Sequence, residues 1–133
     1  MKQNISVVPL ENAGKIQFGM TRDALRQAMG ADFTEFRKSR FSKNTSDDYK
    51  FLHVFYNEQN KCVAVEVFKE CEITIAGTVI PWDAREFGKW LLQQDNTAEI
   101  SESEAISKKL SIGMSAMENH VESILFGMPG YYD

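Results

Sequence analysis

A helix start that occurs twice, each time followed by two strand-like runs, constrains this chain more than any other feature. Thr21 and Asp83 are both good N-cap residues, and each follows a large apolar residue that can pack against the first helical turn. The first predicted helix covers residues 21–29 and stops at Gly30, which tolerates the left-handed conformation that ends many helices. The second covers residues 83–94. Their apolar faces superimpose when the caps are aligned, which favours two related units.

A hairpin is predicted after the first helix. Residues 51–56 and 61–69 are strand-like runs on either side of a four-residue turn at residues 57–60. This arrangement pairs Val54 with Val63.

A second hairpin is predicted after the second helix. Residues 110–114 and 119–126 flank a turn at residues 115–118, which pairs Ile112 with Val121. The two hairpins align without a gap at a constant offset of 58 residues. Helix, loop and hairpin therefore form a candidate internal repeat.

These elements predict an α+β fold with two helices packed on one face of an antiparallel sheet. The length of 133 residues suits a single domain over residues 1–133, with repeat units of about 14–70 and 71–133. A short hairpin within residues 72–80, folding at Gly77, is expected to join the units by adding strands between them.

The alternation of side chains along each predicted strand separates two sheet faces. The first is aliphatic, includes Leu125, and should pack against the helices. The predicted core contains Leu25, Phe87, Trp90, Leu91, Val54, Val65, Ile112 and Val121. The second face mixes aromatic rings, histidines and carboxylates, and also carries Ile124 and Phe126. Either loops or the C-terminal tail cover this second face, or it is a recognition surface.

Tyrosine and other aromatic residues framed by carboxylates are typical of protein-binding hot spots and suit a basic partner. The candidate partner-binding residues are Asp47, Asp48, Tyr49, Phe51, His53, Phe55, Glu66, Phe68, Glu122, Tyr131 and Tyr132. A net charge of −4 argues against nucleic-acid binding, which needs clustered cations. Apolar runs are too short to cross a bilayer and no signal peptide precedes them, so we expect a cytoplasmic protein without a membrane partner.

Catalytic and metal-binding patterns are weak. Cys62 and His120 lie on neighbouring predicted strands and form a conceivable nucleophilic pair, or a metal site together with His53. Glu66 and Glu122 are a conceivable acid and base. None of these groups has a helper residue at motif spacing. We therefore predict that the chain is not an enzyme and needs no metal or cofactor.

The segment GKIQFGMTRDALRQAMG, residues 14–30, resembles the helix entry of BamE-like and β-lactamase-inhibitor-protein-like domains. That resemblance implies helices on one face of an antiparallel sheet and a protein partner on the other. The chain as a whole is similar to small acidic bacterial immunity proteins of polymorphic or contact-dependent toxin systems. It lacks the lipobox cysteine and paired disulfides of the first two families, and the cytoplasmic immunity role remains.

The resemblance implies a protein that neutralises a toxin, most simply a basic toxin domain, by direct binding. Two alternatives stay open. One is a general adaptor or assembly module. The other is a small-ligand-binding protein or unrecognised enzyme, which a ligand-sized apolar pocket with converging polar groups would favour.

Overall fold

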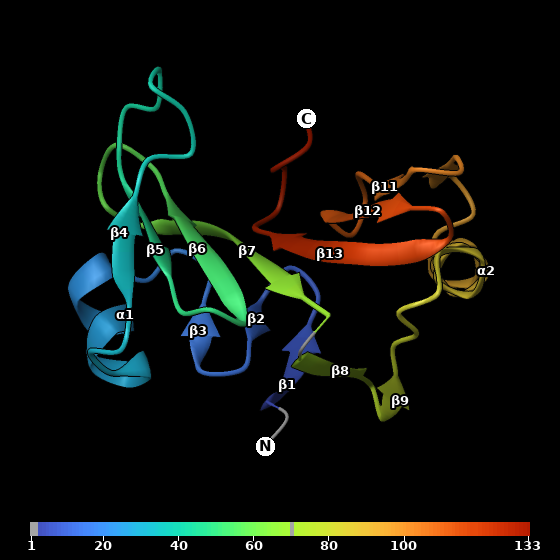
Figure 1. The fold of residues 1–133 in the computed structure, drawn as a ribbon, viewed down its shortest axis with the longest axis horizontal. Coiled ribbons are helices and arrows are strands. Elements are labelled where there is room, and N and C mark those ends of the chain that lie inside the picture. The colour runs from blue at the N-terminus through green and yellow to red at the C-terminus, as the bar shows by residue number, and fades with distance from the viewer. Residues whose placement is uncertain (1–2, 70) are drawn as a thin grey trace.

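Within residues 3–69 and 71–133, which the computed structural model describes, the chain forms two helices and two sheets (Figure 1). The larger sheet has eight antiparallel strands. In spatial order they are β10 (Glu99–Ile100), β11 (Glu104–Ser107), β12 (Ile112–Met117), β13 (His120–Gly127), β7 (Cys62–Phe68), β6 (Leu52–Tyr56), β5 (Ser46–Asp48) and β4 (Thr34–Phe36). The α+β class is confirmed, but two sheets replace the single sheet of the prediction.

The smaller sheet has five strands and is mixed, because β1 and β8 run parallel. In spatial order its strands are β3 (Ile16–Gln17), β2 (Asn12–Ala13), β1 (Gln3–Val8), β8 (Cys71–Ile75) and β9 (Thr78–Val79). The hairpin predicted within residues 72–80 forms as β8 and β9, with Ala76 and Gly77 at positive φ in its turn. Its predicted place between the two units was wrong, because β8 pairs with β1 and so joins the smaller sheet.

Both helices begin where their capping residues predict, and α1 ends at the predicted stop, Gly30. Helix α1 spans Arg22–Met29 and helix α2 spans Ala84–Gln94. The side-chain oxygens of Thr21 and Asp83 accept hydrogen bonds from the backbone N–H three residues later, at 3.2 and 2.9 Å. Gly30 ends α1 with a φ of +95°. These local signals act within one turn of the chain, so they survive any tertiary arrangement.

The start of each helix is hydrogen-bonded to the turn that precedes the last strand of the meander following it. The backbone N–H of Arg22 donates to the carbonyl of Asn60 at 2.8 Å, and that of Ala84 donates to the carbonyl of Asn119 at 2.9 Å. Strands β4–β7 follow α1, strands β10–β13 follow α2, and the two meanders meet where β7 pairs with β13. Asn119 therefore occupies in the second unit the position that Asn60 occupies in the first. The offset between these two residues is one residue longer than the predicted 58.

The register of the first hairpin differs from the prediction by two residues. Val54 pairs with Val65 and not with Val63. Asn60 adopts a φ of +59° and its N–H donates to the carbonyl of Asn57, which makes a tight turn, and the ladder shifts between Phe55 and Tyr56. A two-residue shift keeps the same side chains on the same face.

The second hairpin was placed wrongly by a larger amount. Ile112 pairs with Phe126, because β12 runs on to Met117 and the turn consists of only Glu118 and Asn119, both at positive φ. Two residues at positive φ are characteristic of a type I′ hairpin turn. The ladder also shifts between Ser115 and Ala116, which leaves one extra residue on β13.

This bulge inverts the predicted faces of the second half of β13. Ile124 and Phe126 lie opposite Met114 and Ile112 and are buried, whereas Leu125 turns to the opposite face. The prediction had these three residues reversed. A β-bulge changes the alternation by one residue, which is enough to exchange the two faces.

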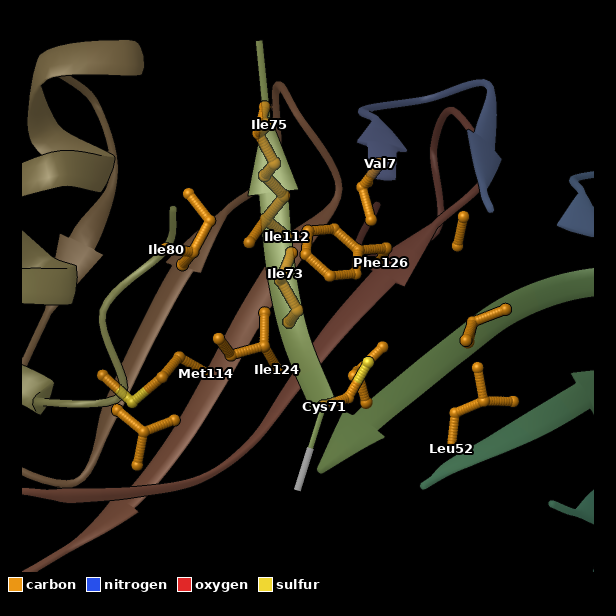
Figure 2. Packing of buried hydrophobic residues seen from close by; sticks show 14 of the residues in the cluster. Val7, Leu52, Cys71, Ile73, Ile75, Ile80, Ile112, Met114, Ile124 and Phe126 are labelled. Atoms are coloured by element: carbon orange, nitrogen blue, oxygen red, sulfur yellow. The ribbon is translucent and has the colours of Figure 1, made fainter. Parts of the chain in front are cut away.

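The core lies mainly between the two sheets. Figure 2 shows Ile73 and Val7 of the smaller sheet against Phe126, Ile112 and Ile124 of the larger one. In Figure 1 the helices stand at the two ends of the larger sheet, α1 beside β4 and β5 and α2 near the turn between β12 and β13. The smaller sheet therefore covers the middle, a role that the prediction gave to the helices.

Seven of the eight predicted core residues are at most 1% exposed. The exception is Trp90, which is only partly buried and packs its ring against Phe87 at 5.6 Å between centroids. Phe87 is the α2 aromatic residue that is fully buried in the core, with 0% exposure. None of the helices formed by the described residues is long and apolar enough to cross a membrane.

Candidate protein-binding face

The larger sheet turns one face to the core, and we call the opposite face the outer face. Side chains alternate along each strand, so His53 on β6 and Glu66 and Phe68 on β7 share the outer face, while Val65 points into the core. His53 lies directly opposite Glu66 in the ladder, and Asp48 lies opposite His53 on the other side. The sheet thus brings four polar or aromatic candidates from three strands together.

His53 is the centre of a mixed aromatic and acidic group that we call the His53 cluster: Phe36, Asp48, His53, Phe55 and Phe68. The His53 ring centroid lies 4.6 Å from that of Phe36 and 4.7 Å from that of Phe68. Its Nε2 atom lies 3.4 Å from Asp48 Oδ1. The His53 side chain keeps 25% of its surface exposed, so the cluster is open to a partner.

Phe36 is a member that the sequence reasoning missed. It lies on β4, a three-residue edge strand in a region expected to be a loop. The pattern Thr34-Glu35-Phe36 alternates, but three residues are too few for periodicity to distinguish a strand from a loop.

A hollow of about 620 Å³ adjoins the His53 cluster. Its lining includes Asp48, His53, Phe68, Met117, His120 and Glu122. Both histidines of the chain are therefore at this hollow, together with carboxylates and the lysines Lys50 and Lys69. Met117, the last residue of β12, is 66% exposed and lies in the lining of this hollow.

The C-terminal tail covers another part of the outer face. Tyr131 lies against Gly127 and Tyr132 lies against Gly113, and neither glycine has a side chain that would block the ring. The two tyrosine rings meet edge to face with centroids 5.2 Å apart. Burial raises the pKa of Tyr132 to about 12. Both explanations of this face therefore apply, because the tail covers β12 and β13 while the His53 cluster stays partly open.

No protein-family model, curated protein or solved structure matches this chain.

Three of the candidate residues lie too deep to form an exposed surface. Asp47 is 0% exposed and Tyr49 and Phe55 are each 6% exposed. Asp47 lies opposite Val54 in the ladder, so its side chain shares the inward face and not the outer one. Tyr49 points its hydroxyl to the carbonyl of Gly30 at 3.4 Å. Phe55 does lie on the outer face, but the Lys38 ammonium sits 4.3 Å above its ring centroid.

The remaining candidates lie in different places. Glu66 is half-buried and accepts a hydrogen bond from Ser123 Oγ at 2.7 Å, which links β7 to β13. Glu122 is exposed on β13 beside the hollow. Phe51 is partly buried and faces a second hollow near β1, away from the His53 cluster.

The two residues considered as a nucleophilic pair, Cys62 and His120, differ in exposure. Cys62 is 0% exposed, and burial raises the pKa of its thiol to about 12, so it is a poor nucleophile at neutral pH. His120 is exposed at the start of β13. Among the described residues, no group of three or more His, Cys, Asp or Glu side chains is placed to hold a metal ion.

The contact of Tyr132 in the C-terminal tail with Gly113 in the sheet can be tested by substitution. Replacing Gly113 by alanine is expected to cost about 1–3 kcal/mol of unfolding free energy, because the new methyl group collides with the Tyr132 hydroxyl. In a Tyr132→Ala background the same substitution should cost much less, with a coupling energy of about 0.5–3 kcal/mol between the sites. Urea denaturation of the four proteins in the cycle measures it. Additive costs would show that the tail does not rest on Gly113.

Proposed function

We propose that this chain is a protein-binding module that docks its partner on the open part of the outer face, at the His53 cluster. The observation that carries the proposal is a group of aromatic rings in tilted and edge-to-face contact at the surface, with carboxylates among and beside them. Such rings bury large apolar areas at little entropic cost, and they concentrate binding energy in a few residues. Asp48 within the cluster and Glu122 at the adjoining hollow supply charges that orient a partner.

The loop between β4 and β5, residues 37–45, extends this surface. Phe41, the middle residue of this loop, is 78% exposed, and the loop stands away from the body of the molecule (Figure 1). Internal bonds hold it in shape: Arg37 Nη1 donates to the carbonyl of Ser42 at 2.7 Å, and the N–H of Ser39 donates to Ser42 Oγ at 3.0 Å. A loop already ordered before binding loses less entropy when a partner docks.

The proposed partner is a basic toxin domain, and the proposed role is that of a cytoplasmic immunity protein. The net charge of −4 and the carboxylates at the hollow support a basic partner, because opposite charges accelerate association. The proposal assigns no catalytic step and no cofactor to the chain. Binding alone neutralises a toxin when the bound protein blocks the toxin's active surface.

The test uses the protein that co-purifies with the tagged chain from its native host. Phe68→Ala and His53→Ala are each expected to weaken binding by about 2 kcal/mol, or roughly 30-fold in Kd, mainly through faster dissociation. Leu92→Ala is the matched control, because Leu92 is an apolar residue on α2 with 42% exposure, outside the proposed surface. Surface plasmon resonance measures the rates. Weakening by the control variant with no change for the other two would move the interface to α2.

The same partner distinguishes an immunity protein from an adaptor. An immunity protein is expected to abolish the toxic activity of its partner at a one-to-one ratio, whereas an adaptor binds and leaves that activity in place. Phe68→Ala should restore toxicity in proportion to the lost affinity. A partner that binds at the His53 cluster but has no activity to inhibit would support the adaptor role.

A further inference from the structure

A second hollow of about 600 Å³ lies away from the His53 cluster, where β1 and β2 meet the end of α1 and the β5–β6 turn. Its apolar lining includes Ile5, Met29 and Phe51. Among the described residues, its charged lining is Lys15, Lys50 and Asp32. This volume lies within the range of about 300–1,000 Å³ that small-molecule sites occupy.

The backbone around this hollow is held by defined turns. Gly14 has a φ of +60° and donates its N–H to the carbonyl of Ser6 at 2.8 Å, and a side chain here would lie 2.9 Å from Ile5 Cγ1. Lys50 has a φ of +78° and donates its N–H to Asp48 Oδ1 at 2.7 Å. Lys15 and Lys50 therefore start from fixed backbone positions beside the apolar lining.

The charges at the rim favour an anion. Neither Lys15 nor Lys50 forms an ion pair with any residue in the described ranges, and two ammonium groups outnumber the single carboxylate of Asp32. The whole chain is acidic, but the described lining of this hollow carries two lysines against one aspartate, so its local charge is positive beside the apolar lining. A ligand with an apolar body and an anionic head would contact both the apolar lining and the two lysines.

We propose that this hollow binds a small amphipathic carboxylate, with its apolar body against Ile5, Met29 and Phe51 and its carboxylate between Lys15 and Lys50. The site is independent of the proposed protein-binding function. Of the residues that the structure describes, only Lys50 borders both hollows, so a variant of Lys15 tests the ligand site without touching the His53 cluster.

The experiment titrates the ¹⁵N-labelled full chain with octanoate and follows backbone amide shifts by NMR. We expect saturable shifts confined to residues 3–6, 13–15, 29–32 and 49–51. Lys15→Met removes one charge and keeps the side-chain length, and it should weaken binding about threefold to fivefold. Lys50→Asn, which tolerates positive φ, should weaken it further in the double variant. Octanol should bind at least about fivefold more weakly than octanoate, and octylammonium more weakly still.

The matched control is Lys108→Met, an exposed lysine on the far meander, which should leave octanoate binding unchanged. Several results would overturn the proposal: equal binding of octanol and octanoate, an unchanged affinity in the double lysine variant, shifts that map elsewhere, or no saturation at millimolar octanoate. An unperturbed spectrum of Lys15→Met outside the hollow shows that the variant is folded. Loss of octanoate binding says nothing against partner binding at the His53 cluster, so the two proposals fail separately.

Discussion

Asp47→Ala is expected to lower the unfolding free energy by about 3–5 kcal/mol. Asp47 is fully buried and accepts three hydrogen bonds: from Arg26 Nε at 2.9 Å, Arg26 Nη2 at 2.7 Å and the Tyr56 hydroxyl at 2.7 Å. Removal of the carboxylate leaves a guanidinium and a phenol without their shared acceptor in a largely dry place. Chemical denaturation measures the loss.

The control uses the second carboxylate on the same guanidinium. Glu35 also pairs with Arg26 at 2.9 Å, but its side chain is 48% exposed. Glu35→Gln should therefore cost less than about 1 kcal/mol, because water screens an exposed ion pair. Equal costs for the two variants would mean that burial does not set the strength of this network.

The same network predicts a loss of stability at high pH. Burial, followed by the hydrogen bond to Asp47, raises the pKa of Tyr56 well above its ordinary value of 10.0. Above pH 10 the unfolded chain therefore releases the Tyr56 proton while the folded chain keeps it, and the unfolding free energy falls as the pH rises. In the Tyr56→Phe variant the unfolding free energy should depend less on pH above 10, even if the variant is less stable than the parent chain at pH 7. Chemical denaturation at a series of pH values measures the difference.

The second large effect is expected for Phe126→Ala, at about 3–5 kcal/mol of unfolding free energy. Phe126 is 1% exposed and lies between the two sheets, near Ile112 and Ile73 (Figure 2). Truncation removes a whole ring from the place where β13 meets the smaller sheet. The cavity that remains adds to the lost burial, because the sheets are fixed by their own ladders and relax only in part.

Phe41→Ala is the matched control for this substitution. The side-chain change is identical, but Phe41 is 78% exposed in the β4–β5 loop, so the unfolding free energy should change by less than about 0.5 kcal/mol. Guanidinium denaturation of both variants gives the comparison. Similar losses would place Phe41 inside a packed cluster, contrary to its exposure. A small loss for Phe126→Ala would show that the sheets close on the cavity.

The candidate site was only partly predictable. His53 and Phe68 share one face because they lie on adjacent strands, and the two-residue error in the hairpin register did not move them to another face. The prediction that Asp47 lies on the binding surface was wrong. The face to which its side chain points depends on the pairing of Asp47 with Val54, and the sequence did not define the turn that joins these two strands. Phe36 was missed because an edge strand of three residues carries too little pattern.

What the sequence determined by itself is local. Thr21, Asp83 and Gly30 specify the helix boundaries, since a capping side chain reaches backbone groups within one turn whatever surrounds it. The existence of the hairpins follows from their β-branched and aromatic runs in the same way.

The tertiary structure decided the rest. The hairpin registers depend on non-glycine residues at positive φ, such as Asn60 and Asn119, and on a bulge that exchanges the faces of Ile124 and Leu125. The parallel pairing of β1 with β8 joins segments about 68 residues apart, since Gln3 meets Cys71. The strand registers and pairings depend on small differences in packing energy between strands far apart in the sequence. A local sequence pattern does not predict those differences.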